Sequence, residues 1–343
     1  EPFFQPGGTR TLGRVTHHYF GHVQGASRRM NEAVEGLSAT LREKGTLGDA
    51  TARMLRYQDL LRAEACLPLL GHTACGAWAE NGRLSGVVAV SEEGLVCLKG
   101  QAFLDMTSDA DVAAFAGVPY ALGCPRDGSV MTNGQWGDTA WAASSFTDAP
   151  FHRDYDVVRN DSYADLLRAV LLAHGYNSDL DFSPLNTLRE SRRIRGRHTL
   201  TLSDVLLHRA FDDCVAVACT PYDTHGRASS VLINMGMLHY DVNPLKVRIP
   251  YRCFLPEGLE GLLVGGKCLS ATRDASSLCR MNADVENAGY ALGLAAALAV
   301  AGGHDVSAVD VKALQARLRA AGCLPDFVES EAAGVEESLE ALR

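Results

Sequence analysis

LLVGGKCLSATRDASSLCRMNADVENAGYALGLAAALAV, residues 262–300, is the stretch that decides the fold of this chain. Its first three residues, Leu262-Leu263-Val264, are apolar and typical of a short buried strand. A tight turn is expected at Gly265-Gly266, followed by a polar loop. The apolar run over residues 283–301 then predicts a long helix.

The predicted helix carries Gly289, Gly293 and a run of alanines, so we expect another backbone to approach it closely. A strand that passes through glycines into a helix N-terminus often presents backbone N–H groups to an anion or a polar ring. The pattern alone leaves two interpretations open. One is an ordinary buried βα unit with small residues for packing, and the other is a cofactor cradle.

The same stretch resembles the C-terminal flavin-binding signature of FAD-dependent oxidoreductases with a glutathione-reductase-like FAD/NAD(P)-binding fold. The resemblance is carried by GGKCLSAT at residues 265–272, by Arg280-Met281, and by GYALG at residues 289–293. It implies an α/β protein with a central parallel sheet, a β-meander, flanking helices and an inserted α+β substrate domain. It also implies cofactor contacts at Gly266, Arg280, Met281, Asn282 and Gly289.

The first residues resemble the part of that fold that follows its second strand. Glu1 stands where the family has an acidic residue that binds the adenosine ribose, although an ordinary charged terminus is the alternative. Gly7, Gly8 and Thr9 stand where a family loop faces the pyrophosphate and the flavin. The G-x-G-x-x-G fingerprint that should precede them is absent from the sequence. We therefore expect either a fragment of a longer protein or a separate chain that supplies the missing unit.

Residues 26–105 are expected to add helices and a meander to the cofactor domain. Helical periodicity predicts two helices, over residues 30–44 and 49–65. Alternating strands follow, with turns at Asn81-Gly82 and Glu93-Gly94. An Asn-Gly pair between two alternating runs is a strong hairpin signal.

Residues 103–120 resemble the family's strand and loop that return to the sheet beside the ADP half of the cofactor. The resemblance implies cofactor contacts at Thr107 and Asp109. Ser108 and Ala110 replace two glycines of the family pattern. Because glycine permits positive φ and close approach, the replacements predict weaker or altered binding of the ADP half of the cofactor, unless the loop tolerates them.

Residues 121–249 are expected to form the substrate or cap domain, inserted between residues 1–120 and 250–305 of the FAD-binding domain. Residues 306–343 would form C-terminal helices. Within the cap, RESRRIRG at residues 189–196 resembles a family strand that runs towards the substrate cavity. Arg192 is the candidate for holding an anionic or polyhydroxylated ligand there, and a salt-bridged surface strand is the alternative.

YDTHG at residues 222–226 resembles a D-x-H-G turn of the family. Asp223 can orient the imidazole of His225, and a histidine with a pKa near neutrality suits proton abstraction from a hydroxyl as hydride leaves. A turn whose Asp and His only bond nearby backbone groups fits the pattern equally well. The expected catalytic residues are therefore His225, Asp223 and Arg192.

Length, charge and cysteine content limit the size of the core, the kinds of binding partner and the expected compartment. The 343 residues can bury a large core and should form two lobes. A formal net charge of -9 disfavours a nucleic-acid or anionic-membrane surface. The 10 cysteines include no C-x-x-C pair, so we expect no metal site and reduced thiols in a cytoplasmic protein. We also expect no membrane span, because no apolar run was found to approach the roughly 20 residues required, and no signal segment.

Together these features predict a FAD-dependent oxidoreductase of the dehydrogenase or oxidase type. The resemblance implies hydride transfer between flavin N5 and a small hydroxylated or unsaturated substrate. The alternative is a non-catalytic or partner-completed subunit of a flavoprotein complex, which the missing fingerprint favours. A flavin-dependent RNA-modifying enzyme is disfavoured by the negative charge. The expected partners are a small-molecule substrate and either a second copy of the chain or the chain that supplies the missing unit.

Overall fold

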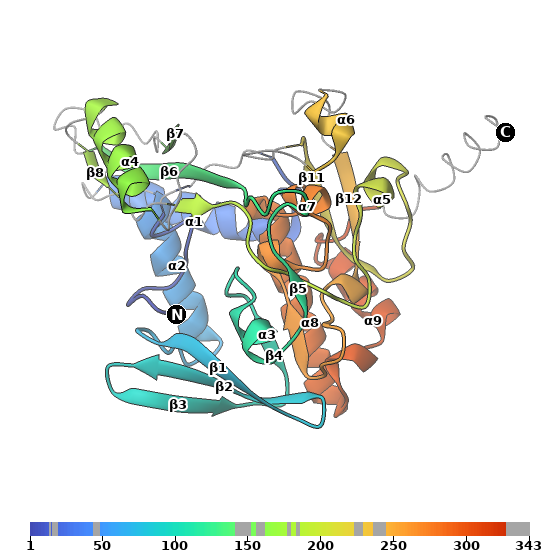
Figure 1. Ribbon diagram of the computed structural model, residues 1–343. Coiled ribbons are helices and arrows are strands. Elements are labelled where there is room, and N and C mark those ends of the chain that lie inside the picture. The colour runs from blue at the N-terminus through green and yellow to red at the C-terminus, as the bar shows by residue number, and fades with distance from the viewer. Residues whose placement is uncertain are drawn as a thin grey trace. The chain divides into compact units, whose positions relative to one another are not determined.

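The computed structural model describes residues 1–13, 15, 20–43, 49–140, 152–155, 162–176, 180–182, 186–222, 229–235 and 245–326. The chain forms two compact units (Figure 1). Unit 1 comprises Glu1–His18, Arg29–Thr73 and Met131–Arg189, and unit 2 comprises Tyr19–Arg28, Ala74–Val130 and Glu190–Arg343. The mixed α/β class is confirmed. The predicted division into a cofactor domain, a cap and C-terminal helices stays a prediction.

Unit 1 combines helices with a small antiparallel sheet. The two predicted helices are present as α1 (Gly25–Glu43), which begins in unit 2, and α2 (Asp49–Ala63). The Ser38 hydroxyl of α1 donates to the Asp49 carboxylate at the start of α2 over 2.7 Å. In the sheet, β6 (Thr132–Ala140) pairs with β7 (His152–Tyr155), β8 (Leu180–Phe182) and β9 (Asn186–Leu188), and α4 (Tyr163–Tyr176) lies between β7 and β8 in the chain.

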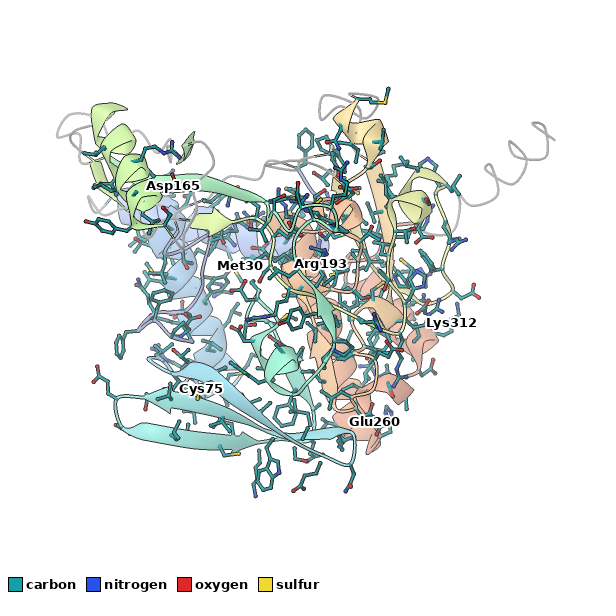
Figure 2. The ribbon with its side chains drawn as sticks, in the orientation of Figure 1. Met30, Cys75, Asp165, Arg193, Glu260 and Lys312 are labelled. Carbon is teal, nitrogen blue, oxygen red and sulfur yellow. The ribbon has the colours of Figure 1, made fainter. Side chains whose placement is uncertain are left out.

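The predicted meander forms one sheet of unit 2, in the order β1 (Thr73–Glu80), β2 (Arg83–Ser91) and β3 (Gly94–Lys99). Asn81 and Gly82 both have positive φ, +50° and +75°, as the two central residues of a type I′ hairpin turn require. The hairpin expected from Asn-Gly is confirmed. Figure 2 marks this sheet by Cys75, which lies on β1.

The core of unit 2 is built on α8 (Asn282–Gly302), which packs against β11 (Cys214–Thr220) and α9 (Val311–Ala320). β11 pairs antiparallel with β12 (Leu245–Pro250). The buried residues of α8 recur every three or four positions, so they share one face. They are Ala283, Asp284, Asn287, Ala288, Ala291, Leu292, Ala295, Ala296 and Ala299.

The close packing predicted at Gly289 and Gly293 is wrong. A Cβ at either position would meet no atom of the described residues within 4 Å, apart from the nearby backbone of α8 itself. The alanines on the buried face make the close approach to the strands instead, since their methyl groups keep the helix near its neighbours. A glycine spacing in the sequence does not show which face of the helix is covered.

By length and composition alone, α8 could span a bilayer, which contradicts the expectation that no segment is apolar enough. The alanines and leucines of this helix make its mean hydropathy higher than the sequence analysis expected. A buried core helix meets the same criteria, and α8 packs against β11, β4 and α9. The length and composition of α8 are therefore weak evidence for a membrane span.

A parallel strand pair carries the opening stretch of the fold. β13 (Leu262–Val264) is fully buried and pairs with β4 (Phe103–Asp105), with Leu263 opposite Leu104. Among the residues described, β4 and β13 form a parallel sheet of two strands, and the central parallel sheet of a glutathione-reductase-like arrangement stays a prediction. The other elements of unit 2 are short: α3 (Asp111–Phe115), β5 (Tyr120–Ala121), β10 (Arg193–Ile194), α5 (Leu202–Leu206), α6 (Val231–Asn234) and α7 (Arg273–Ser277), with 3₁₀ turns η1 (Tyr251–Cys253), η2 (Gly266–Cys268) and η3 (Val306–Ala308).

The loop expected between β13 and α8 is polar, but it is not an open loop. It contains η2 and α7, and most of its residues from Cys268 to Cys279 are buried. Its charged side chains are hydrogen-bonded to other parts of unit 2, as Arg273 is to Glu190. Burial of polar residues is possible because their partners come from distant positions in the chain, which the local pattern does not show.

Replacing Leu263 by Ala should lower the free energy of unfolding by about 2–5 kcal/mol, because the substitution leaves a cavity in a fully buried strand. The matched control is Leu104→Ala on the paired strand, where the side chain is 38% exposed and the loss should be smaller. Chemical denaturation of both variants measures the two values. Equal losses would contradict the assignment of β13 to the core.

Candidate functional site

The carboxyl ends of the parallel strands β4 and β13 form the first part of the candidate site. Parallel strands end at the same edge of a sheet, and ligands of α/β proteins bind outside that edge. At this edge Gly265 is closely surrounded: a Cβ there would lie 2.7 Å from Met106 Sδ and 2.8 Å from Leu292 Cδ1. The Lys267 ammonium forms an ion pair with Asp109 over 3.1 Å, so the loops after β13 and β4 are joined.

The buried Asp105 carboxylate shapes the loop after β4. It accepts hydrogen bonds from the N–H of Thr107 over 3.1 Å, from the Thr107 hydroxyl over 2.7 Å and from the N–H of Ala113 over 2.9 Å. The Thr107 hydroxyl accepts in turn from the N–H of Asp111 over 3.0 Å. Thr107, predicted as a cofactor contact, thus has its hydroxyl engaged in holding the loop.

Ser108 and Ala110 have φ of +65° and +53°, so the loop adopts the left-handed conformation that glycine favours. A residue with a Cβ is less stable there by about 1–2 kcal/mol. Ser108 and Ala110, which stand where the family pattern has glycines, therefore adopt a glycine-like backbone conformation at a cost in strain. Gly266 on the facing loop has φ of +73°, and a Cβ there would lie 3.6 Å from Ser108 Oγ.

Arg192 lies at the same edge. Its Nη1 donates to the Asp109 carbonyl over 2.8 Å and pairs with the Asp111 carboxylate over 2.7 Å. Its guanidinium lies 5.5 Å from the centroid of the Tyr120 ring. The structure therefore brings together Arg192, Thr107, Asp109 and Gly266 from three separate stretches of sequence.

The N-terminus of α8 forms the second part of the candidate site. Met281 is the N-cap residue and supplies no side-chain hydrogen bond to the helix end, so the N–H groups of the first turn are not capped by it. The predicted contacts Arg280 and Asn282 flank it and are partly buried. Leu292, which touches the strand edge, lies about 15 Å further along the helix axis. The two parts thus define an elongated region along α8.

Asp284, in the first turn of α8, is buried, and no pattern in the sequence singles it out. Its Oδ1 accepts from the N–H of His22 over 2.7 Å and its Oδ2 from the N–H of Cys219 over 3.3 Å. Burial raises the pKa of this carboxyl to about 6, against the opposing effect of the two hydrogen bonds. An acidic residue at the third position of a helix is so common that it does not by itself indicate a functional residue.

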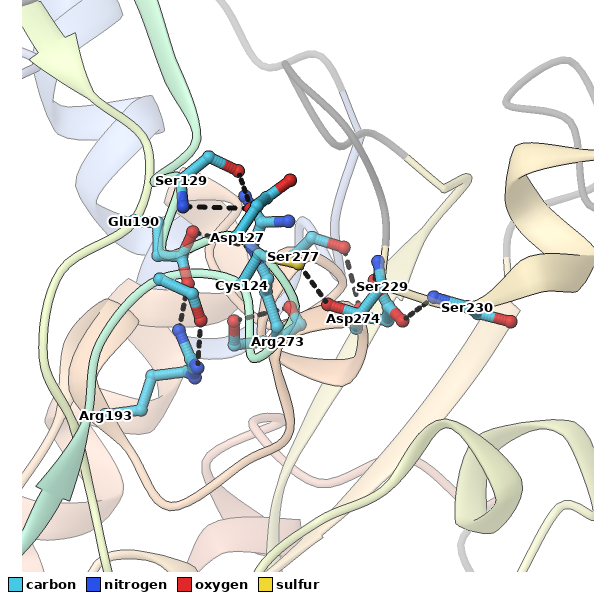
Figure 3. A network of polar contacts seen from close by, with 12 residues as sticks. Cys124, Asp127, Ser129, Glu190, Arg193, Ser229, Ser230, Arg273, Asp274 and Ser277 are labelled. Atoms are coloured by element: carbon cyan, nitrogen blue, oxygen red, sulfur yellow. Dashed lines mark hydrogen bonds and ion pairs between the residues drawn. The ribbon is translucent and has the colours of Figure 1, made fainter.

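A buried ionic network lies beside the arginine motif (Figure 3). Arg193 is buried and pairs with Glu190, which also accepts from Arg273 Nε over 2.8 Å. A single carboxylate therefore bridges two buried guanidinium groups. Of the two neighbouring arginines in the motif, the structure assigns Arg193 to the interior and Arg192 to the strand edge.

Asp274 extends this network to the segment of the predicted catalytic turn. It accepts from the Tyr222 hydroxyl over 2.8 Å. It also accepts from the N–H groups of Ser229 and Ser230 over 2.8 and 2.7 Å (Figure 3). Burial first, and the neighbouring Asp274 second, raise the pKa of Tyr222. Asp223 and His225, between these attachment points, lie outside the described residues.

The predicted contacts at the start of the chain belong to unit 1, whereas all others in the described part belong to unit 2. Gly7 has φ of +113°, and the Gly8 carbonyl accepts from the N–H groups of Thr11 and Gly13, each over 3.0 Å. The Thr9 carbonyl accepts from Val15 N–H over 2.9 Å. Glu1 is exposed, and its carboxylate accepts from the N–H of Phe3 over 3.4 Å. Residues 7–13 therefore form a hydrogen-bonded turn, and their contacts with the cofactor stay predictions.

In a comparison with known protein families, the model of the FAD dependent oxidoreductases fits residues 6–177 and 181–318. Comparison with curated proteins finds no significant match. Among solved structures, the chain is similar to the OxyS anhydrotetracycline hydroxylase from Streptomyces rimosus, with 12% identity, a TM-score of 0.32, and coverage of 58% of this chain and 48% of that one.

A quinol-fumarate reductase with menaquinol molecules shares 15% identity at a TM-score of 0.26, over 87% of this chain and 54% of that one. A mutant FrdA of Escherichia coli quinol fumarate reductase shares 17% identity at a TM-score of 0.25, over 86% of this chain and 53% of that one. The chain thus spans about half the length of these structures. Scores this low establish no common fold.

Ser108→Gly should raise the free energy of unfolding by up to about 1 kcal/mol, because it removes the strain of a left-handed backbone at a residue with a Cβ. Ser85→Gly, in the ordinary extended backbone of β2, is the matched control and should lose roughly 0.5–1 kcal/mol. Thermal and urea unfolding compare the two variants. Destabilisation of both to the same extent would refute the strain at residue 108.

Proposed function

The chain belongs to the FAD dependent oxidoreductase family, and from this premise we propose that it binds FAD along α8 and oxidises or reduces a small organic substrate. The observation that carries the proposal is the family match, which extends over both units. The two-part region along α8 supports it, because a dinucleotide is long and needs contacts at separated points.

The residues present fit the flavin end of the cofactor. The first turn of α8 has N–H groups that its N-cap residue does not satisfy, and a helix N-terminus attracts negative charge and polar ring atoms. Arg280 adds a cation beside it. Arg280, Met281 and Asn282 would hold the ring, and Gly266 would allow close approach at the strand edge. Glu1, Gly7, Gly8, Thr9 and Gly289 stay predicted contacts.

Bound FAD supplies the hydride-transfer position, flavin N5, which no amino-acid side chain provides. The helix end and Arg280 would stabilise negative charge that develops on the ring. A helix N-terminus contributes about 0.3–1 kcal/mol when exposed and up to about 2 kcal/mol when partly buried. The substrate class we propose is a small hydroxylated or unsaturated molecule.

We propose His225 as the base that removes a hydroxyl proton, with Asp223 orienting its ring. Support comes from Asp274, which bonds Tyr222 on one side of this turn and Ser229 and Ser230 on the other. Arg192 is proposed to hold an anionic or polyhydroxylated group of the substrate. Its Nη1 pairs with Asp111, and a guanidinium has further N–H donors that can bind such a group.

A second candidate function is a subunit whose flavin site is completed by residues from another chain or another part of a longer protein. The favouring observation is the parallel pair β4 and β13, because parallel sheets usually contain more than two strands and are covered on both faces. We propose a cytoplasmic location, because the 10 cysteines are free thiols. We also propose that the chain forms a homo-oligomer.

The purified chain should retain FAD through desalting, visible as a yellow protein with flavin absorption, and should release FAD on denaturation. Identification of the released compound by mass spectrometry separates FAD from FMN. Added FAD should also lose part of its fluorescence on binding if the protein is isolated empty. A chain that neither retains FAD nor quenches it would refute the first proposal, and binding only after a second protein is added would support the subunit alternative.

His225→Ala should slow anaerobic flavin reduction by about 10²–10⁴-fold, because a positioned base contributes that much to proton transfer. Stopped-flow absorbance with a panel of small 2-hydroxy acids and alcohols measures the rate. The exposed His304 is the matched control, and His304→Ala should leave the rate unchanged. An unchanged rate in the His225 variant would exclude it as the base.

A further inference from the structure

The segment before α1 is attached to the start of α8 through one residue, His22. Its N–H donates to Asp284 Oδ1 over 2.7 Å, and its carbonyl accepts from Asn287 Nδ2 over 2.8 Å. Asp284 and Asn287 are one helical turn apart and are both buried. The peptide groups on both sides of His22 are therefore held by side chains of α8.

Neighbouring contacts make the attachment tight. Gly21 has φ of +127°, and a Cβ there would lie 2.8 Å from the Ala283 Cβ. The Ser27 hydroxyl donates to Glu286 Oε2 over 2.7 Å, and the Ser27 N–H donates to Asn287 Oδ1 over 3.3 Å. Residues 21–27 thus lie directly against the first two turns of α8.

Asp284 also binds a third element. Its second oxygen accepts from the N–H of Cys219 near the end of β11. One carboxylate consequently joins the segment at His22, the end of β11 and the first turn of α8. Each of its oxygens is used by a different neighbour.

We propose that Asp284 is a positioning residue of the flavin site, which fixes the direction of the first-turn N–H groups of α8 by clamping residue 22 and β11 to that turn. The inference rests on the proposed function, since it assumes that the flavin ring lies at this helix end. The Asp284 carboxylate would act on the flavin indirectly, because it immobilises the helix end that contacts the flavin.

The clamp, which consists of the hydrogen bonds from the N–H groups of His22 and Cys219 to Asp284, depends on the ionisation of this carboxyl group. An ionised carboxylate accepts hydrogen bonds at both oxygens, whereas in the protonated form one oxygen carries a hydrogen and is a poor acceptor. The pKa of this carboxyl is raised from 3.8 to about 6 in the folded protein. The folded protein therefore takes up a proton as the pH falls through about 6, and the unfolded chain takes it up only near 3.8.

This shift has two opposite consequences. Relative to the unfolded chain, the buried carboxyl destabilises the fold when it is ionised, so its contribution to stability improves as the pH falls from above 6 towards 4. The clamp, in contrast, is complete only above pH 6 and loses one hydrogen bond below it. Retention of the flavin should therefore weaken at a pH at which this residue makes the fold more stable.

The charged and titratable groups around Asp284 do not remove this behaviour. The Cys279 thiol is fully buried and has its pKa raised, first by burial and then by Asp284, so it stays neutral. Burial lowers the pKa of the His22 imidazole, whose Nε2 contacts the Gly322 carbonyl, so the ring is neutral at pH 7. Glu286 on α8 is bonded to Ser27, Arg280 precedes the helix, and the Cys219 thiol lies on β11.

The test measures FAD dissociation from the holoprotein between pH 5 and pH 8, by recovery of flavin fluorescence after dilution. The wild-type rate should rise about tenfold below a midpoint near pH 6, as expected for loss of a hydrogen bond to a charged group. Asp284→Asn has one acceptor oxygen at every pH, so it should release FAD at the fast rate throughout. Asp59→Asn, the same change at an exposed residue of α2, should keep the wild-type profile.

Two results would overturn the proposal: a wild-type rate that does not change across pH 6, or an Asp284→Asn variant that keeps the wild-type profile. If the variant does not fold, amide hydrogen exchange of the wild-type holoprotein replaces it. Protection of the His22 and Cys219 amides, corrected for the intrinsic pH dependence, should fall between pH 7 and pH 5, and constant protection refutes the clamp. Failure of the wild type to bind FAD at pH 7.5 would instead refute the proposed function.

Discussion

Burial of one face of α8 is the constraint on which unit 2 depends. The face is made mainly of alanines, so the helix can lie close to β11 and β4. Close packing of this kind excludes water, and every polar group on the same face must then find a partner in the protein. Asp284 and Asn287 meet this requirement by bonding the backbone of residues 22, 27 and 219. The apolar packing of α8 thereby fixes the path of segments far away in the chain.

The same requirement explains the segment between β13 and α8. Arg273 and Asp274 are buried within it, and each has partners from other parts of unit 2. Glu190 forms ion pairs with two guanidinium groups, and Asp274 accepts hydrogen bonds from a hydroxyl and two N–H groups. Removing one member of such a network leaves its partners buried and unsatisfied, which destabilises the fold.

The candidate site combines ordinary backbone geometry with two strained positions. The loop after β4 retains the left-handed conformation at Ser108 and Ala110, although the sequence lacks the glycines that favour it. The Asp105 carboxylate compensates by holding Thr107 and Ala113. Local preference at residues 108 and 110 is thus overruled by hydrogen bonds that begin at a buried residue of the preceding strand.

The sequence by itself determined the features that depend on neighbouring residues: the strand at Leu262-Leu263-Val264, the long helix after it, the Asn81-Gly82 hairpin, the two helices before the meander, and the family. Periodicity and turn chemistry act over a few residues, so a local pattern is sufficient for them. Tertiary structure alone decided which face of α8 is covered, that Arg193 is interior while Arg192 lies at the strand edge, and that Asp284 joins three elements. These outcomes depend on hydrogen bonds and packing between residues up to 265 positions apart, and no local pattern records such partners.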